Sequence, residues 1–426
     1  MTVKRQKYLQ NLIDRMGNGM IKVITGLRRS GKSYLLFNIF ENWLLQNGVT
    51  KDFIVEIQLD DDEFVSLRNP LKLGEYIRGR IKNPDERTYV FIDEIQFVKK
   101  IENPDLPGDF ISFYEVLNGL LRKNNLDVYI TGSNSKMLSK DILTEFRGRG
   151  DQVHVYPLSF KEVYDTFQGD FSEVYDEYSM YGGLPGLWNL KTDEQKGMYL
   201  KNLFDEVYIK DIVQRHKLNG EKDITTLIEV LSSSVGSYTN PTKIENTFKT
   251  ELKTVYTQKT VANHLGFLED AFLISEAKRF DIKGRKYIGA NSKYYFTDVG
   301  LRNALLNFRQ NEVTHIMENI IYNELLVRGY NVDVGIVETV IKDSDGKQKK
   351  SQLEVDFIAV RGNEKLYIQS AFSLASKEKE MKEKRSLMKI DDSFRKIIVQ
   401  KDTTKSWYDD NGFYIMSLKD FLLGDI

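Results

Sequence analysis

Residues 26–33 read GLRRSGKS, and this stretch decides the fold. It fits the pattern G-x-x-x-x-G-K-[ST], and it lies between an apolar run at 20–24 and a helical pattern at 32–47. The glycines allow backbone N–H groups to curl around a phosphate, and the start of the helix adds its positive dipole. An ordinary glycine turn before a helix is the simpler interpretation, but the strand–loop–helix context favours a phosphate-binding loop.

The polar side chains of this loop have expected roles at a nucleotide. Lys32 is placed to bridge the β- and γ-phosphates, and the Ser33 hydroxyl is placed to ligate Mg²⁺. The nucleotide-binding residues that we predict are Gly26, Arg28, Arg29, Ser30, Gly31, Lys32, Ser33, Tyr34 and Asn134.

A second motif, YVFIDE at residues 89–94, supplies two carboxylates. Its four apolar residues predict a buried central strand, and the acids follow at the carboxyl end, where open α/β sheets bind their ligands. We expect Asp93 to hold the Mg²⁺ through water and Glu94 to polarise an attacking water. Two solvated acids at a strand end are the alternative. Together with the phosphate loop, the pair indicates hydrolysis.

Two later segments add polar groups to the predicted site. The segment TGSNS at 131–135 offers Asn134, which is expected either near the γ-phosphate or as a cap of the next helix. One arginine of RGR at 147–149 is a candidate arginine finger, acting in cis or on a neighbouring copy, and we favour Arg149. A plain surface arginine is the alternative. The predicted catalytic residues are therefore Lys32, Glu94 and Arg149.

Apolar strands alternate with helix-length segments over the first third of the chain, which predicts a parallel α/β sheet. The expected strands are 20–24, 53–57, 89–92, 127–130 and 153–157. Beyond residue 160 the pattern changes to amphipathic helices, with a break at YGGLPG, residues 181–186.

Between residues 223 and 309, three helices are followed by a hairpin, which is the order of a winged helix–turn–helix. A helix at 318–328 and the strands from 332 onward then predict a third, smaller α/β unit. The expected domains are residues 1–165, 166–312 and 313–426.

The charge of the chain is balanced overall but not locally. Its 426 residues include 61 Lys+Arg and 62 Asp+Glu, a net charge of -1 that excludes a globally basic nucleic-acid coat. Residues 241–310 hold twelve basic and seven acidic side chains, and twelve minus seven leaves a local charge of +5. DNA binding by the wing and a protein-interaction role both remain open. The cations on or beside the wing are Lys278, Arg279, Lys283, Arg285, Lys286 and Lys293.

Composition excludes several other classes of site. The chain has no cysteine, so disulfides, thiolate metal sites and cysteine nucleophiles are absent. Its four histidines are scattered, which argues against a histidine metal centre. The charged start MTVKRQKYLQ, and the lack of an apolar run long enough to span a bilayer, predict a soluble, cytoplasmic protein without a membrane partner.

The motifs resemble, in combination, a known group. GLRRSGKS, DEIQ, TGSNS, RGRG with PLSFKEV, YGGLPG and VYIKDIV are similar to the AAA-type P-loop ATPases of prokaryotes that are grouped with archaeal and signal-transduction ATPases. The resemblance covers nearly the whole chain. It implies ATP as the nucleotide, a core of the additional-strand, catalytic-glutamate type, a winged helix, and a terminal domain similar to PD-(D/E)xK nucleases. It supplies no biological role.

The nuclease resemblance can be followed residue by residue. Such a site needs two acids for Mg²⁺ and a lysine for the water, and Glu318 and Asp356 match the first positions. The strand that should carry an acid and the lysine has Gln369 and Ala371 instead. We therefore predict a nuclease-like fold without nuclease activity. Residual metal binding at Glu318 and Asp356, or two plain surface acids, are both open.

Two functions follow from the sequence. The first is Mg²⁺-dependent ATP hydrolysis that repositions the winged helix and the terminal domain, with ATP and ADP as ligands and DNA as a candidate partner. The second is a slow nucleotide-dependent switch without DNA binding. An arginine acting in trans would require a homo-oligomer, and a protein partner is also compatible with the sequence.

Overall fold

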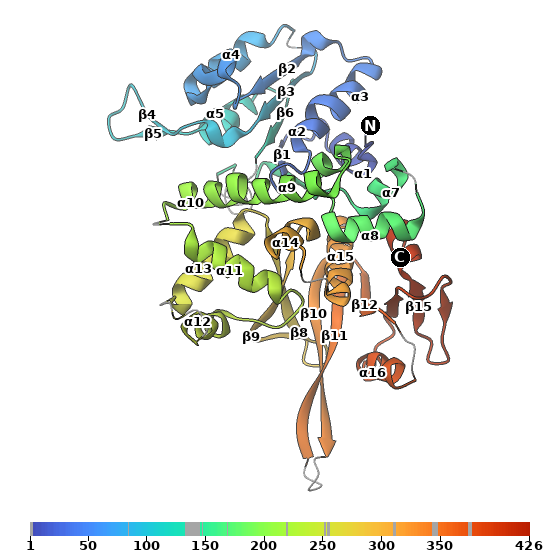
Figure 1. Ribbon diagram of the computed structural model, residues 1–426. Coiled ribbons are helices and arrows are strands. Elements are labelled where there is room, and N and C mark those ends of the chain that lie inside the picture. The colour runs from blue at the N-terminus through green and yellow to red at the C-terminus, as the bar shows by residue number, and fades with distance from the viewer. Residues whose placement is uncertain are drawn as a thin grey trace. The chain divides into compact units, whose positions relative to one another are not determined.

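The structure is a computed structural model of the chain. It describes residues 3–83, 85–132, 145–146, 148–167, 169–218, 220–250, 253, 256–309, 312–342, 348–373 and 377–426. The chain divides into two compact units, Met1–Pro157 with Asp270–Phe272, and Leu158–Glu269 with Leu273–Ile426 (Figure 1). Within the described ranges, no helix is long and apolar enough to cross a membrane. The cytoplasmic location stays a prediction.

The first unit is built on a sheet of five parallel strands. The strands are β1 (Ile21–Thr25), β2 (Ile54–Gln58), β3 (Thr88–Asp93), β6 (Leu126–Thr131) and β7 (Gly150–His154). Their order in the sheet is β2-β3-β6-β1-β7, which confirms the predicted parallel α/β sheet. Strand β6 lies between β3 and β1, and this is the additional strand that the family resemblance implies.

Helices cover both faces of this sheet. One face carries α1 (Gln6–Ile13) and a helical run made of α2 (Lys32–Tyr34), the π-helical η1 (Leu35–Phe40) and α3 (Glu41–Gln46), and the other carries α4 (Pro70–Arg80) and α5 (Phe113–Leu120). Successive side chains of a strand point to opposite faces. Along β3, Tyr89 and Phe91 therefore pack with the helices on the α1 face, and Val90 and Ile92 pack with those on the α4 face. A strand buried on both faces reads as a continuous apolar run. Short elements complete the unit: η2 (Lys51–Phe53), η3 (Asp62–Arg68), η4 (Ile95–Phe97), β4 (Ile101–Glu102) and β5 (Phe110–Ile111).

The second unit begins with helices. They are α7 (Phe160–Phe167), α8 (Phe171–Tyr181), η5 (Pro185–Asn189), α9 (Asp193–Leu203), η6 (Phe204–Ile209), α10 (Lys210–His216), α11 (Lys222–Ser233), α12 (Pro241–Thr250), α13 (Gln258–Asp270) and α14 (Val299–Leu305). The predicted break at residues 181–186 is confirmed, since α8 ends at Tyr181.

A sheet of eight strands forms the rest of the second unit, in the order β14-β15-β13-β12-β11-β10-β8-β9. The strands are β8 (Ile274–Asp281), β9 (Lys286–Phe296), β10 (Asn331–Lys342), β11 (Gln348–Arg361), β12 (Glu364–Ala371), β13 (Arg395–Gln400), β14 (Trp407–Tyr408) and β15 (Tyr414–Ser417). The helices of this part are α15 (Val313–Val327), α16 (Lys377–Leu387) and α17 (Leu418–Leu423).

The β8–β9 hairpin does not stand free as a separate wing. Strand β8 pairs in parallel with β10, with Arg279 opposite Val334 and Asp281 opposite Ile336. The expected boundary between residues 312 and 313 therefore lies inside one continuous sheet, and the expected second and third domains share that sheet. An open strand edge leaves backbone groups unpaired, and β10 supplies the partners that β8 needs. The winged-helix and nuclease-like descriptions stay predictions.

A buried carboxylate holds the YGGLPG segment. Asp298 accepts hydrogen bonds from the backbone N–H groups of Gly183, at 2.8 Å, and Leu301, at 3.1 Å, so it fixes the segment and caps α14 at once. Gly183 cannot carry a side chain, because a Cβ there would lie 2.1 Å from the carbonyl oxygen of Leu158. The glycines of this motif thus serve packing within the second unit.

We expect Asp298→Ala to lower the free energy of unfolding by about 3 kcal/mol, because it leaves buried N–H groups without an acceptor. Urea unfolding followed by circular dichroism measures the loss. The matched control is Asp170→Ala, which removes the exposed cap of α8 and should cost about 1 kcal/mol. Equal losses for the two variants would contradict the role given to Asp298.

Candidate nucleotide site

The phosphate loop leaves β1 at its carboxyl end in a conformation that only glycine allows at its first position. Gly26 has a φ of 141°, and a Cβ there would lie 2.1 Å from the carbonyl oxygen of Val155. Gly31 has a φ of 93° immediately before α2. Both glycines therefore adopt left-handed backbone conformations that other residues rarely reach, as the tight turn of a phosphate loop requires.

Lys32 is buried under the loop with only 4% of its surface exposed. Its Nζ donates to the carbonyl oxygens of Gly26, at 3.1 Å, and Leu27, at 3.0 Å. Burial lowers the pKa of Lys32 to about 8, although the carboxylates of Glu94 and Asp93 oppose that shift. An anion bound at the loop would favour the charged ammonium further.

The two acids are held by the neighbouring strand. The Thr131 hydroxyl, at the end of β6, donates to Asp93 and accepts from the backbone N–H of Glu94 at 3.1 Å. Burial raises the pKa of Asp93, against hydrogen bonds from Thr131 and Ser33. Burial also raises the pKa of Glu94, against the charge of Lys32. Sequence reasoning placed the TGSNS segment near the site but did not assign this role to Thr131.

Most of the predicted nucleotide-binding residues line one cavity of about 300 Å³. Its lining is Arg28, Arg29, Gly31, Lys32, Ser33, Tyr34, Asp60, Asp93 and Glu94. Asp60 was missed, although its signal was available, because it follows the predicted strand 53–57 and so lies at the same edge of the sheet. Ser30 does not line the cavity: it is fully buried, and its hydroxyl has no hydrogen-bond partner among the described residues.

Comparison with known proteins gives the first unit a family. Residues 18–164 match the family model described as an AAA domain, and residues 172–312 match a domain of unknown function, DUF8612. An uncharacterized protein of Haemophilus influenzae is 33% identical over 430 residues, which cover 99% of this chain and 98% of the relative. The chain belongs to the family of this relative. Its first unit is an AAA-type P-loop domain.

Other similar proteins are more distant. An uncharacterized protein of Methanocaldococcus jannaschii is 29% identical over 417 residues, covering 94% of this chain and 85% of the relative. AMPPCP-bound DnaA from Aquifex aeolicus is 16% identical, with a TM-score of 0.31 over 62% of this chain and 87% of that one. Cdc6p from Pyrobaculum aerophilum is 12% identical, with a TM-score of 0.29 over 74% of this chain and 94% of that one. The match of residues 18–164 to the AAA domain and the strand order β2-β3-β6-β1-β7 support the AAA-type fold of the first unit.

Arg149 lies away from the phosphate loop of its own AAA domain. Its carbonyl accepts from the backbone N–H of Ile21 at 2.8 Å, so it stands at the amino end of β1, whereas the loop leaves the carboxyl end. Five residues of strand separate the two positions by about 16 Å, farther than an arginine side chain extends. The expectation of an arginine finger acting in cis is therefore corrected for Arg149, and a role on a neighbouring copy remains as a proposal.

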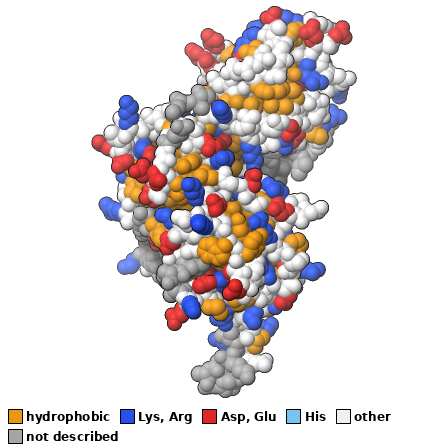
Figure 2. Space-filling view, turned by 90° about the vertical axis from the view of Figure 1, so that its right-hand side faces the viewer, with side chains coloured by type: hydrophobic (Ala, Val, Ile, Leu, Met, Phe, Trp, Pro, Cys, Tyr) orange, Lys and Arg blue, Asp and Glu red, His pale blue; other side chains and the backbone are white. Residues whose placement is uncertain are grey.

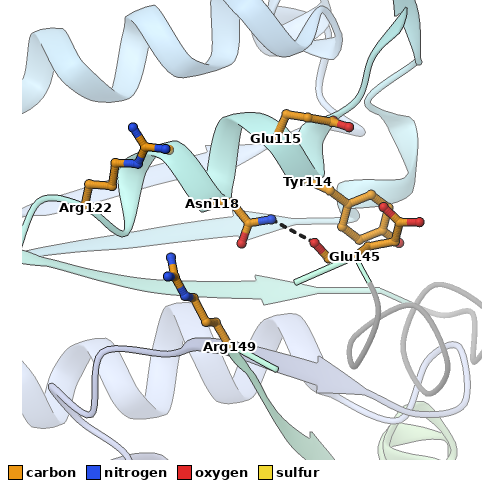
Figure 3. Close-up of a pocket in the computed structure, with 7 residues that line it drawn as sticks. Tyr114, Glu115, Asn118, Arg122, Glu145 and Arg149 are labelled. Carbon is orange, nitrogen blue, oxygen red and sulfur yellow. Dashed lines mark hydrogen bonds between the residues drawn. The ribbon is translucent and has the colours of Figure 1, made fainter. Parts of the chain in front are cut away.

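Arg149 instead lines a second cavity of the AAA domain, of about 570 Å³ (Figure 3). Arg122 lines it as well, and Asn118 donates to the backbone carbonyl of Glu145 at 2.8 Å at its wall. Asn134 and Arg147 lie outside the described residues.

The other sequence-predicted groups lie in the second unit. Glu318 and Asp356 come close together there, beside Lys293. Lys293 is buried, so one of the six expected wing cations is not available to a phosphate backbone. The exposed cations of the hairpin turn are Lys283, Arg285 and Lys286. Figure 2 shows basic and acidic side chains interspersed over the displayed face, in keeping with the balanced net charge.

We expect Gly26→Ala to destabilise the AAA domain by about 3 kcal/mol, because the new methyl group would collide with the Val155 carbonyl. Gly48→Ala is the matched control, since Gly48 also has a left-handed φ, of 91°, but has no atom within 4 Å of its added Cβ. The control should lose about 1 kcal/mol from backbone strain alone. Thermal unfolding measures both, and similar melting temperatures for the two variants would disprove the close approach.

Proposed function

We propose that the AAA domain binds ATP with Mg²⁺ and hydrolyses it. The observation that carries the proposal is the position of Glu94, whose carboxylate lines the same cavity as Lys32, Ser33 and Asp93. Such an arrangement supplies a group for the phosphates, a hydroxyl and a carboxylate for the metal ion, and a base for the water. The raised pKa of Glu94 suits a base that must accept a proton near neutral pH.

The chain fits Mg²⁺ only together with a nucleotide. Among the described residues, no group of three or more His, Asp or Glu side chains has the geometry of a metal site. Mg²⁺ keeps several waters and is commonly bound through one or two protein groups plus substrate phosphates. Ser33 and Asp93 would be those groups, and the bound ion would neutralise charge that develops on the phosphates. The choice of ATP over GTP rests on the family resemblance.

We expect Glu94→Gln to lower the turnover of ATP by about 100-fold or more, while the affinity for ATP stays near that of the native chain, because the amide cannot accept the proton of the water. Phosphate release under single-turnover conditions measures the chemical step. Glu63→Gln, which changes an exposed acid outside the cavity, is the control. Unchanged turnover in Glu94→Gln would remove Glu94 as the base, and absence of turnover in the native chain would remove the hydrolytic proposal and leave the nucleotide-dependent switch.

We further propose that the nucleotide state of the phosphate loop alters the β8–β9 hairpin. Thr25, the last residue of β1, bonds through its hydroxyl to the His154 Nδ1 at 2.9 Å. The His154 ring lies 4.7 Å, centroid to centroid, from the ring of Phe272. Phe272 comes two residues before β8 along the chain. Through these contacts, a movement of the phosphate loop would be transmitted to Phe272 and from there along the chain to the start of β8.

The second unit is proposed to act on DNA, as a winged helix fused to a nuclease-like sheet without nuclease activity. The exposed cations Lys283, Arg285 and Lys286 at the hairpin turn support this proposal, since a wing of this kind contacts phosphates. A protein partner at the same surface is the alternative, and then binding to DNA would be absent. Arg149 is proposed to act only as an arginine finger in trans, which one copy supplies to the nucleotide site of a neighbouring copy in a homo-oligomer.

DNA binding should depend on salt with a slope set by these contacts. Replacing Lys283, Arg285 and Lys286 together by alanine is expected to reduce the slope of log K against log salt by about 3, because each phosphate contact contributes roughly 0.9. Fluorescence anisotropy with a short duplex, run with ATP and with ADP, measures the slope and the coupling. Lys201→Ala, an exposed lysine of α9, is the control. Unaltered slopes in the triple variant would reject the hairpin as the DNA contact, and equal affinities with ATP and ADP would reject the coupling.

A further inference from the structure

A buried lysine lies at the centre of an acidic cluster in the second unit. Lys293 of β9 is 4% exposed, and its Nζ lies 2.9 Å from Oε1 of Glu318 on α15 and 2.6 Å from Oε1 of Glu354 on β11. Both contacts are short enough to be charge-assisted hydrogen bonds. The ammonium therefore joins a helix and two strands through one positive charge.

Two more carboxylates lie near those of Glu318 and Glu354. Asp356 is buried on β11, and its side chain accepts from the backbone N–H of Ser370 at 2.7 Å. Burial raises the pKa of Asp356, as does the charge of Glu318, whereas Lys293 lowers it. Glu383 of α16 accepts from Gln369 at 3.0 Å. The cluster is thus Lys293, Glu318, Glu354, Asp356 and Glu383.

Carboxylates gathered in this way require a cation, because their mutual repulsion and burial are otherwise too costly. A divalent metal ion would have to lie 2.0–2.6 Å from the oxygens of Glu318 and Glu354. The ammonium of Lys293 already binds those two side chains, so the two cations compete for one place. Burial acts to lower the pKa of Lys293, but Glu318, Asp356 and Glu354 together raise it above its usual value, so the ammonium stays charged.

We propose that Lys293 is the resident cation of this cluster, that it excludes divalent metal ions from the cluster, and that the terminal sheet therefore performs no metal-dependent phosphodiester hydrolysis. Gln369 supports this proposal. Its amide adds no negative charge to the cluster, which suits the singly charged ammonium of Lys293 better than a divalent metal ion. Its amide also donates to Glu383 and so occupies one of the remaining carboxylates. The proposal is independent of ATP hydrolysis in the AAA domain.

The experiment measures Mn²⁺ binding to the nucleotide-free full-length chain by electron paramagnetic resonance, together with the melting temperature. The native chain and Lys293→Arg should bind no Mn²⁺ at the cluster. Lys293→Met should bind it and gain about 5 °C in melting temperature at saturating Mn²⁺, because the ion then binds only the folded state. Adding Asp356→Asn to Lys293→Met should abolish both effects. Lys286→Met, which changes an exposed lysine of the same strand, should behave like the native chain.

Several outcomes would overturn the proposal. Mn²⁺ binding by the native chain that disappears in Glu318→Gln would show that the metal and the ammonium coexist. Metal-dependent cutting of supercoiled plasmid that Lys293→Met abolishes would make Lys293 a catalytic lysine instead. If Lys293→Met unfolds, its refolding with Mn²⁺, followed by circular dichroism, supports the proposal, and failure to refold with the ion overturns it. Nucleotide is absent throughout, so these results stand whether or not the AAA domain hydrolyses ATP.

Discussion

The parallel register of β1, β6 and β3 is the constraint on which the nucleotide site depends. Ile130 of β6 lies opposite Val23 of β1 on one side and Ile92 of β3 on the other, so the three strands end at one level. Residues that follow each strand then meet without long loops. This common level brings the Thr131 hydroxyl to Asp93 and sets both beside the phosphate loop. A shift of one residue in any pairing would point the acids to the wrong face.

Much of the AAA domain could be predicted because its signals are local. A strand covered on both faces is largely apolar, so β1, β3 and β6 are recognisable in the sequence, and the motifs lie at their ends. The buried charges of Lys22 in β1 and Asp127 in β6 are exceptions that pair with each other. What escaped prediction was contact between strands. The link from Thr131 to Glu94 depends on the register of β6 against β3, which no single stretch of sequence records. The length of β1 separates Arg149 from the loop, because Arg149 stands at the amino end of this strand and the loop follows its carboxyl end.

In the second unit, too, contacts between distant segments were not predicted from the sequence. Lys293 was read as a surface cation of a hairpin because it lies among other lysines and arginines. Its true signal was the run that follows it, since Tyr294, Tyr295 and Phe296 are all buried. Lys293 opens this run and is buried with it, and a buried ammonium requires acids. Those acids come from segments far along the chain, so the sequence shows the need for partners but not their identity.

Because β8 pairs in parallel with β10, the second unit does not end where the family model for its first part ends. The DUF8612 match ends at residue 312, between the two strands that this pairing joins. A chain cut there would keep the hairpin but lose the strand beside it, the acids around Lys293 and the core residues that β10 to β15 contribute. Its open edge would then be free to recruit strands from other molecules. A segment that related sequences share can therefore end inside a sheet, and the part of the chain that folds cooperatively extends beyond residue 312.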